Sequence, residues 1–129
     1  MGKEKILLTI LLIALLTGGV GCKTTMVGED LKTEAIYSMG TLEATMPYNI
    51  DAVFSAAKQT MGDLELSTSI ATKDALAGKI VARDSADKKI AIDIKTVSKD
   101  STNVKIHVGI IGDETKSKMI YNKIKENLM

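Results

Sequence analysis

The chain has 129 residues, with 17 basic and 16 acidic side chains, one histidine and one cysteine. This length suits one small domain, and a single cysteine excludes an intramolecular disulfide. The near-neutral charge and low aromatic content argue against nucleic-acid binding, because there is no basic excess to neutralise phosphates and there are few rings for bases to stack on.

Residues 1–21 have the three parts of an export signal. Lys3 and Lys5 form a basic start, an apolar run covers residues 6–16, and small residues follow as far as Gly21. As a helix the apolar run would be about 17 Å long, which is short for a hydrocarbon core of about 30 Å. We expect a signal peptide over residues 1–21. An uncleaved anchor and ordinary secretion with a free thiol are the alternatives.

Cys22 follows directly, and its setting resembles that of the acylated cysteine of bacterial lipoproteins. In that class the peptide before the cysteine is removed, and the new N-terminus carries acyl chains such as palmitate. Gly21 fits the pattern, whereas Gly19 stands where an aliphatic residue is usual. Lys23, in a position where Asp favours the inner membrane, implies the outer membrane facing the periplasm. The resemblance therefore makes Cys22 a lipid-attachment site in the cell envelope, with the membrane as a partner.

The stretch 22–34 is polar and has no sustained period, so it predicts a flexible tether. As a coil it would hold a domain about 20 Å from the lipid. Cleavage before Cys22 leaves 15 basic and 15 acidic residues, so the charge of the mature chain gives no reason for it to remain at a membrane.

From residue 35 onward, some segments have an apolar residue at every second position, as in strands, and others at every third or fourth position, as in helices. Alternation over residues 35–46 changes parity at Gly40 and predicts one strand with a bulge there. A stripe from Ile50 to Met61 predicts a helix capped by Asn49 and ended by Gly62. Four strands are predicted over residues 64–72, 78–84, 88–97 and 102–111. A second amphipathic stripe, from Ser117 to Leu128, predicts the C-terminal helix.

The two last strands alternate strictly, with isoleucine and valine on one side and charged residues on the other. Such strands have one buried and one solvated face. Short turn-rich connections favour antiparallel hairpins. The exposed face should carry Lys89, Asp93, Lys95, Lys105 and His107.

Two apolar helix stripes and one apolar sheet face are buried most simply in two layers. We therefore predict an α+β domain over residues 35–129. It is a two-layer sandwich of an antiparallel sheet of about five strands with two helices on one face, in the order β-α-β-β-β-β-α.

The order and spacing of three segments resemble a family of small bacterial lipoproteins, domain of unknown function 3568. The segments are 47–57, 78–82 and, most of all, 104–114 with the apolar positions that follow it. An arginine is common in that family where this chain has His107. The resemblance covers Tyr37 to Leu128, and it implies fold and localisation but brings no catalytic residues.

One cluster in the sequence could carry chemistry: His107, Asp113 and Glu114, whose side-chain types bind metals or act as acid and base. One histidine falls short of a usual metal-ligand set, and carboxylates at a helix start are explained by the helix dipole. We expect no catalytic residue, no metal and no cofactor.

We carry two main hypotheses for function. The first is a non-catalytic interaction module that binds an envelope protein, through the edge strand beginning near Ala35 or through the polar sheet face. The second is a small-ligand carrier or sensor, with a pocket between helices and sheet lined by Phe54, Ile92, Ile106 and Tyr121. An enzyme is a distant third.

Overall fold

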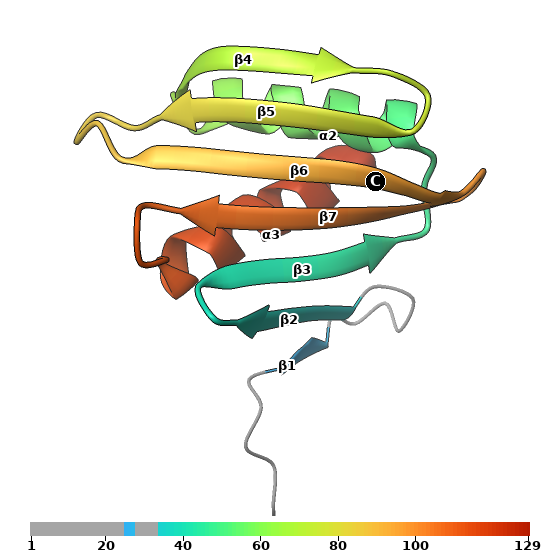
Figure 1. The fold of residues 1–129 in the computed structure, drawn as a ribbon, viewed down its shortest axis with the longest axis horizontal. Coiled ribbons are helices and arrows are strands. Elements are labelled where there is room, and N and C mark those ends of the chain that lie inside the picture. Colours follow the sequence, from blue (N-terminus) through green and yellow to red (C-terminus); the bar gives the residue numbers. More distant parts are fainter. Residues whose placement is uncertain (1–24, 28–33) are drawn as a thin grey trace, which may run out of the picture.

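The computed structural model describes residues 25–27 and 34–129. They form one antiparallel sheet with two helices (Figure 1). The strands are β1 (Thr25–Val27), β2 (Glu34–Ser38), β3 (Thr41–Met46), β4 (Ser67–Lys73), β5 (Ala77–Arg83), β6 (Lys89–Ser98) and β7 (Ser101–Val108), and the helices are α2 (Ile50–Asp63) and α3 (Glu114–Leu128). The signal segment and Cys22 lie outside the described residues.

The seven strands are ordered β1-β2-β3-β7-β6-β5-β4. Both helices lie behind the same face of this sheet, α2 behind β4 and β5 and α3 behind β7 and β3 (Figure 1). The predicted α+β class, the two layers and the order of elements from residue 35 are therefore confirmed. The sheet has more than the five strands predicted. The range predicted as the first strand contains two strands, β2 and β3, and β1 lies before it.

The correction at residues 35–46 concerns the turn at Gly40, which is a hairpin turn and not a bulge. Ser38 pairs with Thr41, and the two residues between them, Met39 and Gly40, have φ values of 52° and 83°. Two positive φ values define the type I′ turn, which matches the twist of paired strands. The shift of the apolar residues from odd to even positions at Gly40 therefore marks a reversal of the chain direction.

β1 lies inside the range predicted as tether. Thr25 pairs with Ile36 and Val27 with Glu34, so β1 runs antiparallel to β2 on its outer side. As a result β2, the strand that begins near Ala35, has neighbours on both sides along Glu34–Ile36. That stretch is not a free edge.

The helices form where the apolar stripes predict them. Asn49 caps α2 by accepting the amide hydrogen of Ala52 over 2.8 Å. Gly62 does not end this helix, contrary to prediction. The helix is terminated instead by Glu65, which has a φ of 57°. The Glu65 amide donates to the Gly62 carbonyl, and the Leu66 amide donates to the Met61 carbonyl. This pattern is a Schellman motif in which a non-glycine residue takes the left-handed position.

The core lies between the helices and the apolar face of the sheet. The side chains that alternate inward along β6 and β7 are buried as predicted, and so are the stripes of both helices; these core residues include Val53, Met61, Ile90, Ile94, Val104, Val108, Ile120 and Ile124. On the opposite face Lys79 pairs with Asp93 at 3.1 Å, and Asn103 donates to Glu43. No helix in the described part of the chain is both long and apolar enough to cross a membrane.

Candidate functional site

The three residues of the predicted chemical cluster have separate structural partners. The His107 ring lies 3.2 Å from the Thr41 hydroxyl through Nδ1 and 3.3 Å from the Ile110 carbonyl through Nε2. Asp113 caps α3 by accepting the Lys116 amide hydrogen, and Glu114 pairs with Lys118 one helical turn away at 2.8 Å. Within residues 25–27 and 34–129, no three side chains of metal-binding type are grouped to hold an ion. The structure gives this set no common centre.

The four residues of the predicted ligand pocket all belong to the core. Ile92 and Ile106 are fully buried, Tyr121 is 2% exposed and Phe54 is 9% exposed. The surface cavities between the elements are lined by other residues. No described cavity therefore favours the carrier hypothesis at this position.

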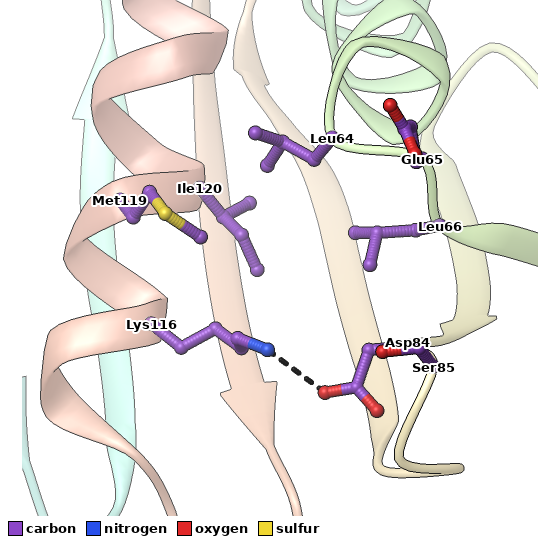
Figure 2. A pocket seen from close by; sticks show the side chains of 8 residues that line it. All are labelled: Leu64, Glu65, Leu66, Asp84, Ser85, Lys116, Met119 and Ile120. Carbon is purple, nitrogen blue, oxygen red and sulfur yellow. Dashed lines mark hydrogen bonds and ion pairs between the residues drawn. The ribbon is translucent and has the colours of Figure 1, made fainter.

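One cavity, of about 230 Å³, lies between the end of α2, the β5–β6 loop and α3 (Figure 2). At its rim the Lys116 ammonium donates to the Asp84 carboxylate at 2.8 Å. The Asp84 side chain is only 8% exposed, and it also accepts the amide hydrogens of Ala86 and Lys88. Lys88 in turn pairs with Asp113 at 3.2 Å. We call Asp84, Lys88, Asp113 and Lys116 the Asp84 cluster.

The electrostatics of the Asp84 cluster favour ionised carboxylates. The hydrogen bond from Lys116, followed by the amide of Lys88, lowers the pKa of Asp84 from 3.8 to about 2. The pKa of Asp113 is also lowered, first by the Lys116 amide and then by the Lys88 ammonium. Neither group is suited to exchange protons near neutral pH. The cluster instead fastens the β5–β6 loop to the start of α3.

Sequence reasoning missed Asp84, which it treated as the last residue of a strand. The available signal was the run Asp84-Ser85-Ala86-Asp87, because Asp readily accepts amide hydrogens two residues further on and so starts a turn. Its partner Lys116 is 32 residues further along the chain, and no sequence pattern near either residue predicts that the two pair.

A second surface feature is an apolar end of the molecule, which we call the apolar tip: Met39, Ile110 and Ile111. Their exposed fractions are 97%, 96% and 88%. The predicted strand over 102–111 ends at Val108, because Gly109 turns the chain with a φ of 76° and the two isoleucines lie in the β7–α3 loop. His107, bonded to both Thr41 and Ile110, joins this loop to the β2–β3 turn.

A third feature is the outer edge of β4. Within the described residues β4 pairs with β5 only, and all seven of its residues are exposed. Its pairing shifts between Thr68 and Ile70, and the Ser69 hydroxyl donates to the Val81 carbonyl there. The first six residues of β4 are uncharged. This edge offers unpaired backbone groups along a strand with little charge.

The fold thus defines a small two-layer α+β domain whose described surface features are an apolar tip, a charged loop-to-helix cluster and an open sheet edge. Residues 5–127 match the family model described as Protein of unknown function (DUF3568), and the chain belongs to that family. No curated protein matches the sequence.

Proposed function

We propose that this family member is a lipid-anchored bacterial cell-envelope protein that serves as a non-catalytic interaction module. In this proposal acyl chains at Cys22 hold it at the outer membrane, facing the periplasm, and an extended segment of another envelope protein binds to the edge of β4. The observation that carries the binding role is the exposed, unpaired edge of β4 in the described structure.

The anchor is supported by sequence. The apolar run of residues 6–16 ends a few residues before Gly21-Cys22, and Lys23 follows where Asp would favour inner-membrane retention in the lipoproteins that the segment resembles. Two or more acyl chains hold a protein stably, whereas one gives marginal binding. A neutral mature domain therefore depends on this attachment.

The interaction role is supported by the backbone of β4. An edge strand can accept another strand, whose main-chain hydrogen bonds supply affinity while its side chains supply specificity. Natural edges are commonly protected by charges, bulges or covering loops. On β4 the protection is slight: Lys73, at one end, is paired with Asp51, and Ser69 lies at an irregularity near the other end.

The non-catalytic character is supported by the roles of the polar side chains. Asp84 and Asp113 hold a turn and a helix start, and Glu114 pairs along α3. His107 holds two turns together. Each of these candidates for acid, base or ligand is thus explained by a local structural task.

The test is photocrosslinking in living cells with benzoylphenylalanine in place of Ile70. This side chain is 43% exposed on β4, and we expect it to capture one envelope protein repeatedly. Met119 on α3 is the matched control, because it is also apolar and is 45% exposed. The probe at Met119 should not capture that protein.

A second variant makes the outcome specific to strand pairing. Ile70→Lys places a charge in the middle of the edge, and edge charges disfavour strand addition. With the probe moved to the neighbouring Thr72, we expect Ile70→Lys to abolish the capture without lowering the amount of folded protein. Equal capture from Ile70 and Met119, or capture that survives Ile70→Lys, would refute docking at β4.

A further inference from the structure

We infer that the apolar tip lies in the surface of the lipid bilayer to which Cys22 is anchored. This inference rests on the proposed anchor and adds a second membrane contact, which would fix how the domain stands on the membrane. Its occupant is the lipid itself, in the interfacial region where apolar side chains and basic groups are both accommodated.

The tip is unusually apolar for a free surface, and the two turns that form it are packed together. Its isoleucines lie on the β7–α3 loop, and its methionine lies on the adjoining β2–β3 turn. The turns touch through their backbones: a side chain at Gly112 would come within 2.5 Å of the Gly40 Cα. Large apolar side chains that are about nine-tenths or more exposed and gathered on two packed turns mark an interaction site.

The length of chain between the anchor and the fold restricts what the tip can reach. Cys22 is three residues before Thr25, so at about 3.3 to 3.6 Å per residue the two Cα atoms are at most about 11 Å apart. Thr25 pairs with Ile36, which is three residues before Met39, and β2 runs from Ile36 toward the tip. β1 therefore begins at the end of its pairing with β2 that is nearer the tip, and it runs away from the tip (Figure 1). Two residues, Lys23 and Thr24, separate Cys22 from β1, whereas the sequence predicts a tether over the whole stretch 22–34.

The charged side chains beside the tip are mostly paired within the fold. A cavity of about 690 Å³ beside the tip is lined by the β5–β6 loop, the strand ends that flank it and the β7–α3 loop. Its lining includes three basic side chains: Arg83 is paired with Asp87 at 3.7 Å, Lys88 is paired with Asp113 at 3.2 Å, and Lys89 has no ion pair among the described residues. The aliphatic part of Lys88 runs within 3.5 Å of where a side chain at Gly109 would begin. Lys89 is therefore the basic side chain of this lining that can meet an anionic headgroup without first leaving an ion pair.

The opposite end of the sheet serves as an internal comparison. Leu76, in the β4–β5 turn, is 70% exposed. The seven-residue strand β5 separates this turn from the β5–β6 loop beside the tip, a length of about 20 Å at about 3.3 Å per residue. With the tip at the lipid, Leu76 would be held well away from the membrane surface.

The test uses the full chain, acylated in cells, purified from their membranes and reconstituted in vesicles of phosphatidylethanolamine and phosphatidylglycerol containing nitroxide-labelled lipid. Cys22 is the only cysteine, so Ile111→Cys, Met39→Cys and Leu76→Cys each supply one thiol for an environment-sensitive fluorophore. We expect strong quenching by the labelled lipid at Ile111→Cys and Met39→Cys, and only background quenching at Leu76→Cys.

Mass analysis of the same samples reports acylation separately. Acylated protein with equal quenching at Ile111→Cys and Leu76→Cys overturns the lipid contact and leaves the anchor intact. Protein without acyl chains overturns both. A fluorophore at the tip that is shielded from the labelled lipid and also from aqueous iodide would show that a protein surface covers the tip, which likewise overturns the inference.

Discussion

Gly112→Ala should lower the free energy of unfolding by about 3 kcal/mol or more, from a strained backbone together with a steric clash. Gly112 has a φ of 113°, which side-chain-bearing residues rarely adopt. A Cβ there would lie 2.5 Å from the Gly40 Cα and 2.7 Å from the Tyr37 hydroxyl. The turn that carries Ile110 and Ile111 would therefore be forced away from the β2–β3 turn.

Gly62→Ala is the matched control, with the opposite sign. Gly62 lies in α2, and nothing is within 4 Å of the position a Cβ would take. Replacing a helical glycine with alanine stabilises by about 0.5 to 1 kcal/mol. Urea unfolding of both variants, in residues 22–129 with Cys22→Ser, measures the difference. A Gly112→Ala variant as stable as its parent would contradict the packing of the two turns.

Acid should destabilise the domain through Asp84. The pKa of Asp84 is about 2 in the folded chain and 3.8 ordinarily, so the folded state favours the charged form. This contribution to stability is complete above about pH 4 and is lost as the pH falls from 3.8 through 2. Asp84→Asn should lower the free energy of unfolding at pH 7 and reduce its fall over that pH interval.

The partner variant separates the ion pair from other acid effects. Lys116→Met removes the largest cause of the shift, and Asp74 and Asp113, whose pKa values are also lowered, remain in both variants. In a double-mutant cycle the coupling between Asp84 and Lys116 should be favourable at pH 7 and should fall steadily as the pH drops from 3.8 through 2. An acid-induced loss of stability that Asp84→Asn does not change would exclude this role.

The parts of the fold that could be predicted are those set by regular burial. The strict alternation in β6 and β7 puts the apolar side chains on one face of the sheet only. The apolar stripes of the two helices have to be buried as well, so the helices form a layer on that face. Asn49 was predictable as a cap because its oxygen accepts an amide hydrogen three residues away. These local rules agree with the tertiary structure.

The turns were less predictable, because their residues depart from the usual preferences. Met39 holds a left-handed position in a type I′ turn where Asn, Asp or Gly is typical. Glu65 does the same at the end of α2, so Gly62 was a misleading signal. At Met39 the pairing of β2 with β3 holds this conformation, and at Glu65 the backbone hydrogen bonds of the Schellman motif hold it.

The surface features depend on contacts between distant segments. Ile110 and Ile111 continue an apolar strand pattern, and only the turn at Gly109 makes them exposed. β1 is three residues long and has no sequence period; its pairing with β2 shortens the link to Cys22. The sequence predicts the anchor at Cys22, and the described structure adds the apolar tip and the open edge of β4.

The proposed role depends on attachment at Cys22, and metabolic labelling with a clickable fatty acid tests this most directly. Cells that produce the wild-type chain or Cys22→Ser would be labelled, and the purified proteins compared. We predict label on the wild type, none on Cys22→Ser, and release of the variant from the membrane fraction. An unlabelled wild-type protein would contradict the lipid-anchored account.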